Sequence, residues 1–221
     1  MSTIQKNIDV IAEQGIVPLY FTTDQTISIE ILRTLYKAGI RAVEYTNRGP
    51  EALSNFRKMV AVRNAELPEM LLGIGTIKNL EDAKDFSDAA ADFFISPGFV
   101  PEVADFLKDK EVLYAPGCMT PTEIIAAENA GIKLVKLFPG NILGTEFLSS
   151  IKDVFPSLVF MTTGGVEPTH ASIESWFSAG ASAVGLGSKL ISKKRIEEQD
   201  YDVIENETKK MLEIIQTIRR I

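Results

Sequence analysis

The stretch Thr120–Phe138 reads TPTEIIAAENAGIKLVKLF and contains one complete helix-and-strand unit. Thr120-Pro-Thr-Glu123 is a capping box with proline at the first helical position, which predicts the start of a helix. Gly131 is suited to the left-handed conformation that ends a helix just before a strand. The apolar run Ile132–Phe138 then predicts a buried strand. A helix that leads directly into a strand is typical of a parallel sheet, because parallel strands need a crossover between them.

The same alternation recurs along the whole chain, with predicted strands starting about 20–30 residues apart. The predicted strands are Gly15–Phe21, Ile40–Thr46, Met70–Gly75, Asp92–Ser96, Glu111–Ala115, Ile132–Phe138, Leu158–Thr162 and Ala181–Leu186. Eight such units in 221 residues predict a single-domain (β/α)8 TIM barrel over residues 1–221. An open doubly wound sheet is the alternative, but its G-x-G-x-x-G signature after the first strand is missing.

Several helix boundaries are also predicted. The first dozen residues are expected to form an extra helix beneath the barrel, and residues 202–221 a charged amphipathic helix. Glu167-Pro168 predicts a helix start, and a further short helix is expected near Ser188. The apolar stripe of the last helix consists of Ile204, Met211, Ile214, Ile215 and Ile218.

Composition excludes several classes of function. The net charge is −7, with no basic tract, so we expect neither a nucleic-acid partner nor an anionic membrane surface. A single cysteine, Cys118, and a single histidine, His170, leave no cluster with metal-ligand spacing, so neither a metal nor a cofactor is predicted. No apolar run approaches about 18 residues, the length needed to span a membrane. We therefore expect a soluble, cytoplasmic protein.

One predicted strand carries a carboxylate toward the barrel interior. Ala42, Glu44, Thr46 and Arg48 share one face by the period of two that a strand imposes. Chemistry in a barrel lies at the carboxyl ends of the strands, and a buried carboxylate is costly unless it is paired or used. Glu44 is therefore either a catalytic group or half of a structural ion pair with Arg48.

A second strand carries a candidate nucleophile. Lys133 and Lys136 are three residues apart, so in a regular strand they face opposite ways and one of them points inward. Lys136 lies nearer the carboxyl end, among apolar neighbours. Burial disfavours the charged form of a lysine and makes its amine able to attack a ketone and form a Schiff base. The alternative is a lysine that reaches the barrel rim, but Glu44 across the same barrel would supply the proton transfer that an imine needs.

Glycine-rich segments end three further strands. They are Gly73–Thr76, Thr162–Gly165 and Gly185–Ser188. Glycine lets backbone N–H groups approach an anion closely, and the last two loops of a barrel are its usual phosphate site. The hydroxyl of Thr76, on the face shared by Leu72 and Ile74, is a candidate to hold a carboxylate.

Taken in order, these residues resemble the 2-keto-3-deoxy-6-phosphogluconate (KDPG) and 4-hydroxy-2-oxoglutarate (KHG) aldolase family. The motifs that carry the resemblance are Val43–Arg48, Gly73–Thr76, Ile95–Gly98, Pro116–Pro121, Val135–Pro139, Thr163–Gly165 and Gly187-Ser188, which together span nearly the whole chain. The chain departs from the family's usual motifs at Pro139-Gly-Asn141 and at Thr162, and it lacks the first-strand arginine that some members carry.

The resemblance implies a metal-independent class I aldolase with a (β/α)8 fold, working as a homotrimer. It implies that Lys136 forms the Schiff base and that Glu44 is the general acid and base. The implied substrate-binding residues are Arg48 and Thr76 at the carboxylate, Pro97 and Phe138 at the pyruvate part, and Thr163, Gly164, Gly165, Gly187 and Ser188 at the phosphate site. A phosphosugar isomerase or epimerase and a non-catalytic barrel that binds a phosphorylated ligand are the alternatives.

Overall fold

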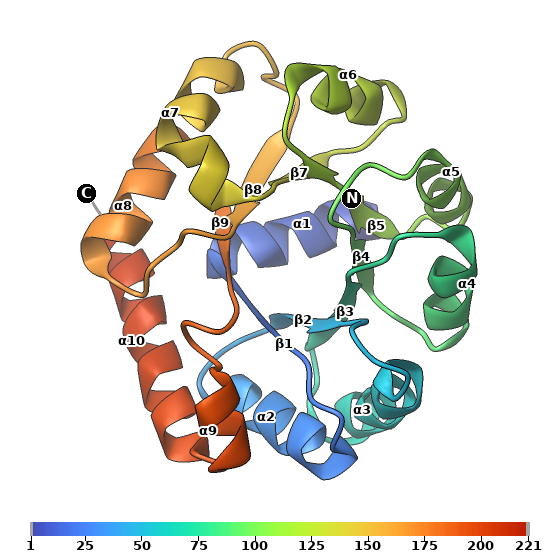
Figure 1. Ribbon diagram of the computed structural model, residues 1–221, viewed down its shortest axis with the longest axis vertical. Coiled ribbons are helices and arrows are strands. Elements are labelled where there is room, and N and C mark those ends of the chain that lie inside the picture. The colour runs from blue at the N-terminus through green and yellow to red at the C-terminus, as the bar shows by residue number, and fades with distance from the viewer. Residues whose placement is uncertain (1, 220–221) are drawn as a thin grey trace.

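The computed structural model describes residues 2–219, and its strands form a (β/α)8 barrel ringed by helices (Figure 1). The strands are β1 (Ile16–Tyr20), β2 (Ala42–Thr46), β3 (Leu71–Gly75), β4 (Phe93–Ile95), β5 (Leu113–Ala115), β6 (Gly117–Cys118), β7 (Leu134–Leu137), β8 (Val159–Thr163) and β9 (Ala183–Leu186). Their order is β5-β4-β3-β2-β1-β9-β8-β7-β6, and the paired neighbours are parallel.

The barrel closes directly after the fifth predicted strand. Only Pro116 separates β5 from β6, so the two ends of the sheet are consecutive in the chain. Proline has no N–H to donate, so it interrupts the hydrogen bonding of the strand. Before the proline β5 pairs with β4, and after it β6 pairs with β7. Each of the eight predicted runs overlaps a strand, and β6 is the one short strand that the prediction missed.

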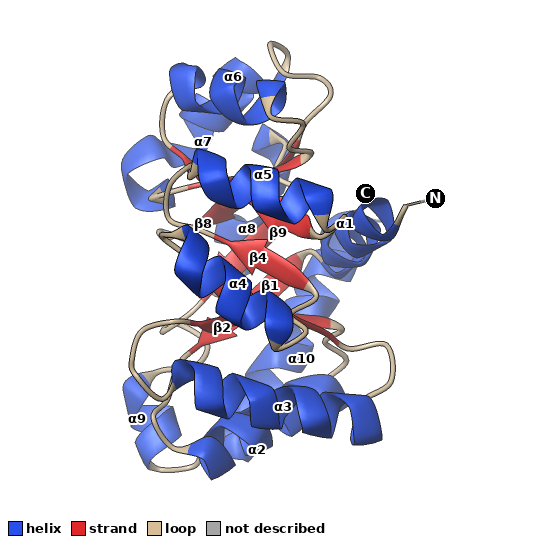
Figure 2. Ribbon diagram, turned by 90° about the vertical axis from the view of Figure 1, so that its right-hand side faces the viewer, coloured by secondary structure: helices blue, strands red, loops and turns tan. Residues whose placement is uncertain are grey.

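Ten helices of the described chain pack outside the strands or across one end of the barrel (Figures 1 and 2). They are α1 (Thr3–Gln14), α2 (Gln25–Lys37), α3 (Ala52–Glu66), α4 (Leu80–Asp88), α5 (Pro101–Asp109), α6 (Pro121–Asn129), α7 (Gly140–Lys152), α8 (His170–Ala179), α9 (Lys193–Glu197) and α10 (Tyr201–Arg219). α7 is broken at Gly144, which has non-helical angles. The fold prediction, including the extra N-terminal helix, is confirmed.

The predicted capping box at the start of α6 is present. The side chain of Thr120 accepts a hydrogen bond from the Glu123 N–H at 3.3 Å, and the Glu123 carboxylate accepts one from the Thr120 N–H at 2.8 Å. These two bonds satisfy N–H groups that have no partner within the helix. Gly131, with φ of 89°, ends this helical segment in the expected left-handed conformation.

Two predicted helix starts are wrong. α8 begins at His170, because the Thr169 side chain, and not Glu167-Pro168, caps its first turn. No helix begins at Ser188: the N–H groups of Leu190 and Ile191 both bond to the Gly187 carbonyl, which makes a single turn. The chain then extends to Ser192, which caps α9.

The core has two layers. Inside the barrel lie Val17, Ala42, Phe93, Ile95, Leu113, Ala115, Leu134, Met161 and Ala183, with Ile8 and Ile11 of α1 packed against them. A larger cluster fills the space between strands and helices. It includes the predicted stripe of α10, of which Ile204, Met211 and Ile215 are buried. Since side chains fill the interior, the open end of the barrel carries the site.

Candidate active site

Lys136 and Glu44 meet inside the barrel. Nζ of Lys136 on β7 lies 4.0 Å from Oε1 of Glu44 on β2, and the two side chains are 7% and 1% exposed. The alternative of a lysine at the solvent-exposed rim is therefore wrong, and Glu44 pairs with Lys136 instead of Arg48. Two buried, opposite charges at this distance stabilise each other and can exchange a proton through small movements or one water molecule.

The barrel is shaped around the Glu44 carboxylate. A Cβ on Gly75 of β3 would overlap Oε1 of Glu44, so only glycine leaves room for this carboxylate. Within residues 2–219, the other carboxylate oxygen, Oε2, is buried and has no hydrogen-bond partner. A buried acceptor without a partner is unusual and costly, which is typical of an atom that meets a water molecule or a substrate.

A cavity of about 700 Å³ lies at the carboxyl ends of β1, β2, β8 and β9. Its lining includes six predicted site residues: Arg48, Thr163, Gly164, Gly165, Gly187 and Ser188. Leu19, which also lines it, is paired with Glu44 across β1 and β2. The cavity therefore adjoins the strand position that carries Glu44.

The glycine-rich loop after β8 packs against the start of α7. Gly164 and Gly165 have φ of 93° and 71°, a region that side-chain-bearing residues rarely adopt. A Cβ on Gly165 would approach the Cα of Asn141 to 2.7 Å. Beside them, Oγ1 of Thr163 is buried and unpaired within the described chain. Thr163, Gly164 and Gly165 all line the cavity, so this loop forms part of its wall.

Besides Lys136 and Glu44, three predicted site residues do not line this cavity. Phe138 lies beside the lysine, with its ring centre 5.0 Å from Nζ of Lys136. Pro97 follows β4, and its carbonyl occupies the space that a Cβ on Gly117 would need, next to the strand that pairs with Lys136. Both residues therefore lie near the lysine.

Thr76 lies just beyond β3, whereas the sequence prediction treated it as part of the strand. Leu72 and Ile74 belong to the outer layer between strands and helices. Thr76 has φ of 64°, a left-handed conformation that ends the strand's alternation. The prediction that Thr76 shares a face with Leu72 and Ile74 assumed that the strand's period of two continues to Thr76. The period ends before this residue, so it does not determine the direction of the Thr76 side chain.

Other cavity residues were not predicted from the sequence. Phe21, Thr22 and Thr23, directly after β1, form one wall of the cavity. At the mouth, Nζ of Lys189 lies 2.9 Å from Oε1 of Glu167. The position of Phe21–Thr23 immediately after the first strand was the available signal, since all strands of a barrel end at the same face.

Cys118 of β6 packs in the layer between strands and helices. It is a buried free thiol, and burial raises its pKa to about 12. Residues 2–219 contain no group of three or more His, Cys, Asp or Glu side chains arranged to hold a metal ion. Among those same residues, no helix is long and apolar enough to cross a membrane.

Comparison with known families agrees with this geometry. The model of the KDPG and KHG aldolase family matches residues 8–207. The chain belongs to this family. Aldolases of this family are carbon–carbon lyases of class I, so the chain is an enzyme of that class. Neither alternative, an isomerase or epimerase or a non-catalytic ligand-binding barrel, gains support from the relatives.

Individual aldolases match over most of their length. A 2-dehydro-3-deoxy-phosphogluconate aldolase from Pseudoalteromonas atlantica is 27% identical over 89% of each chain. A KHG/KDPG aldolase from Escherichia coli is 27% identical over 86% of each chain. Among solved structures, a KDPG aldolase from Legionella pneumophila, with pyruvate captured as a covalent carbinolamine intermediate, has 25% identity and a TM-score of 0.82 over 90% of this chain and 95% of its own.

Proposed function

We propose that this aldolase cleaves a 2-keto-3-deoxy sugar acid to pyruvate and an aldehyde through a Schiff base on Lys136. The observation that carries the proposal is the distance of 4.0 Å between Lys136 Nζ and Glu44 Oε1 inside the barrel. A Schiff base requires a neighbour that takes a proton from the lysine ammonium and later returns it, and the Glu44 carboxylate lies within reach of Lys136 to do so.

The reaction begins at the C2 ketone of the substrate. Glu44 takes a proton from the Lys136 ammonium, and the free amine adds to C2 to give a carbinolamine. Protonated Glu44 then returns the proton to the carbinolamine hydroxyl, which leaves as water and produces an iminium ion. The similar aldolase from Legionella pneumophila holds pyruvate as a carbinolamine, which is the corresponding adduct of the product ketone.

Carbon–carbon cleavage follows from the iminium ion, which accepts electrons. Glu44 removes the proton of the C4 hydroxyl, the C3–C4 bond breaks, and its electron pair forms the enamine of pyruvate while C4 becomes the aldehyde. Protonated Glu44 then delivers its proton to C3, and water hydrolyses the resulting iminium to free pyruvate and the Lys136 ammonium. The same carboxylate thus acts as base and as acid in turn.

The remaining predicted residues orient the substrate. Arg48 and Thr76 hold its carboxylate, and Pro97 and Phe138 pack against the pyruvate part. Orientation of this kind lowers the barrier because the reacting atoms are held at the correct separation before reaction.

The far end of the substrate meets the loops after β8 and β9. Thr163, Gly164, Gly165, Gly187 and Ser188 bind its phosphate through backbone N–H groups and hydroxyls, as concave runs of backbone N–H groups bind anions elsewhere. With KDPG the second product is glyceraldehyde 3-phosphate, and with 4-hydroxy-2-oxoglutarate it is glyoxylate. A pyruvate-release screen over both compounds and the unphosphorylated analogue of KDPG identifies the substrate.

Trapping with pyruvate and borohydride tests the mechanism. Reduction of the imine adds a stable pyruvyl mass to the peptide that contains Lys136, and Lys136→Ala abolishes both the adduct and pyruvate release. The matched control is Lys133→Ala, because Lys133 lies on the same segment but is exposed. Normal cleavage by Lys136→Ala, or an adduct only on another lysine, contradicts the proposal.

We further propose a cytoplasmic homotrimer that has no nucleic-acid or membrane partner. Exposed apolar side chains at Met119, Ile125 on α6 and Ile142 on α7 give outer surface that a second subunit can cover. Light scattering tests the assembly: a trimer has three times the chain mass of 24.3 kDa.

A further inference from the structure

The wall segment Phe21–Thr23 is held from behind by buried side chains. It follows β1, lines the cavity and leads to α2. The carbonyl of Thr22 accepts hydrogen bonds from the Tyr45 hydroxyl at 2.7 Å and from the Asn55 side-chain amide at 3.2 Å. The same amide donates to the Thr23 carbonyl at 3.0 Å. Carbonyls of a loop are thus satisfied by side chains from β2 and α3, and not by a strand partner.

The tethering side chains are themselves fixed. Tyr45 and Asn55 are 0% and 3% exposed, and the Asn55 amide lies 3.3 Å from the Tyr45 hydroxyl. Ser28, also buried, contacts that hydroxyl at 3.2 Å and donates to the Asp24 carbonyl at 2.8 Å. Three consecutive carbonyls, from Thr22 to Asp24, are therefore held by buried donors.

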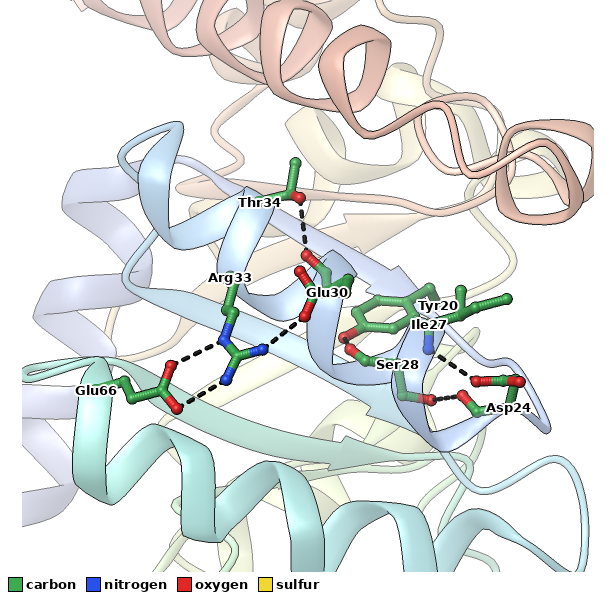
Figure 3. A network of polar contacts seen from close by, with 8 residues as sticks. All are labelled: Tyr20, Asp24, Ile27, Ser28, Glu30, Arg33, Thr34 and Glu66. Atoms are coloured by element: carbon green, nitrogen blue, oxygen red, sulfur yellow. Dashed lines mark hydrogen bonds and ion pairs between the residues drawn. The ribbon is translucent and has the colours of Figure 1, made fainter.

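Figure 3 shows the α2 side of this arrangement. The Tyr20 hydroxyl donates to the Ser28 carbonyl at 2.6 Å, and Ser28 reaches Asp24 at the start of the helix. Arg33 of α2 makes two hydrogen bonds to the Glu66 carboxylate of α3, at 2.7 and 2.8 Å. α2 is thus joined to α3, the helix that carries Asn55, so the tether lies between fixed elements.

Tyr45 connects the wall to the catalytic carboxylate. It follows Glu44 directly on β2, and successive residues of a strand face opposite ways. Glu44 points into the barrel, while Tyr45 belongs to the outer layer, where its ring lies 5.7 Å from that of Phe21. One strand therefore sets the position of both the proton-transfer group and the cavity wall.

We propose that Tyr45 and Asn55 are positioning residues that fix Phe21–Thr23 as the wall for the part of the substrate released as the aldehyde. The proposal rests on the function proposed above. Neither side chain touches the reacting atoms. The wall lies beside the loops after β8 and β9, since β1 neighbours β9 in the barrel. Loss of the hydrogen bonds that hold Phe21–Thr23 therefore weakens binding of the part of the substrate that becomes the aldehyde. It leaves enamine formation from pyruvate unchanged.

Two reactions separate these effects. Cleavage of KDPG or 4-hydroxy-2-oxoglutarate, whichever the wild type cleaves faster, requires the whole cavity. Exchange of the methyl protons of pyruvate with D₂O requires only Lys136, Glu44 and the pyruvate site, because it proceeds through the enamine. The variants are Tyr45→Phe, which removes only the hydroxyl that donates to Thr22, and Asn55→Ala, which removes the amide that donates to Thr22 and Thr23. Thr208→Val is the matched control: it removes a buried hydroxyl that donates to the Ile204 carbonyl at 2.7 Å on α10.

We expect KM for cleavage to rise at least about five-fold in Tyr45→Phe and Asn55→Ala. Each substitution removes hydrogen bonds to the carbonyls of Thr22 or Thr23, so the wall segment is no longer held in place. The rate of pyruvate exchange stays within about two-fold of the wild type, and Thr208→Val matches the wild type in both reactions. Thermal melting of Tyr45→Phe and Thr208→Val is measured alongside, and we expect both variants to be folded to the same extent.

Two results overturn the inference: an unchanged KM in both wall variants, or a parallel loss of exchange and cleavage. The wild type is measured first. If it catalyses neither pyruvate exchange nor pyruvate release, the proposed function is wrong, which is distinct from failure of the positioning role alone.

Discussion

Glu44 and Lys136 stand on opposite walls of the barrel and meet in its interior, with Oε1 and Nζ 4.0 Å apart. In the strand order, β7 is the fourth neighbour of β2 by way of β1, β9 and β8. Two long side chains are needed to bring the charges together from opposed strands. Their contact therefore depends on side-chain length as well as on charge, which leads to the first prediction.

Glu44→Asp and Glu44→Gln are expected to separate adduct formation from proton transfer. Aspartate is one methylene too short to reach Lys136, and glutamine reaches it but cannot exchange a proton. Both variants lose cleavage and pyruvate exchange by about 10²-fold or more. Given enough time, both still form the borohydride-trapped adduct at Lys136. Exchange measured by NMR and adduct measured by mass spectrometry check this; wild-type exchange rates would remove Glu44 from the mechanism.

Gly75→Ala is expected to abolish activity while leaving the fold intact. The new methyl group would overlap the Glu44 carboxylate, which must move away from Lys136. Overpacking of this kind costs about 1–3 kcal/mol of stability, and displacement of a catalytic group lowers turnover by about 10²-fold. Gly98→Ala is the control, because a Cβ there has no atom within 4 Å. Equal activities of the two variants in a pyruvate-release assay would contradict the steric role of Gly75.

The Cys118 thiol is expected to be unreactive in the folded enzyme. Burial raises its pKa to about 12, so at pH 8 almost none of it is the nucleophilic thiolate, and reagents cannot reach it. Iodoacetamide at pH 8 should label the native protein slowly and the urea-unfolded protein completely, as measured by intact mass. Complete labelling of the native protein within minutes is the outcome that excludes this environment.

Glu205 is expected to contribute to stability only while it is ionised. Hydrogen bonds and ion pairs from Lys209, at 2.5 Å, and Lys37, at 2.8 Å, lower its pKa below the ordinary value of 4.5. A carboxyl whose pKa is lower in the folded state stabilises fully above 4.5, and this contribution disappears as the pH falls through the lowered value.

Melting of Glu205→Gln across pH checks this contribution. At pH 7 the wild type should melt a few degrees above the variant, a small difference because the lysines are exposed to solvent. The gap should narrow as the pH falls below 4.5 and the wild-type carboxylate is protonated. A gap that is constant from pH 7 to pH 3 would show that the ion pairs do not carry the effect.

Local chemistry in the sequence was enough to predict most of the elements. The capping box at Thr120, the left-handed Gly131 and the apolar runs depend on neighbours a few residues away, so they can be read without coordinates. The inward direction of Lys136 was predicted in the same way, because the period of two within a strand makes Lys133 and Lys136 face opposite sides. Where a local signal had a nearby competitor, as at Pro168 and Thr169, the helix start was misplaced.

Distances between strands were decided only by the tertiary structure. The sequence puts Glu44 and Lys136 on inward faces, but only closure of the barrel sets β2 opposite β7 and their charges 4.0 Å apart. The need for glycine at position 75 arises from its contact with that carboxylate, which lies on another strand. The tether from Tyr45 and Asn55 to the wall joins three separate elements, and no local pattern encodes it. Periodicity acts along one strand, whereas packing determines which side chains from distant segments touch.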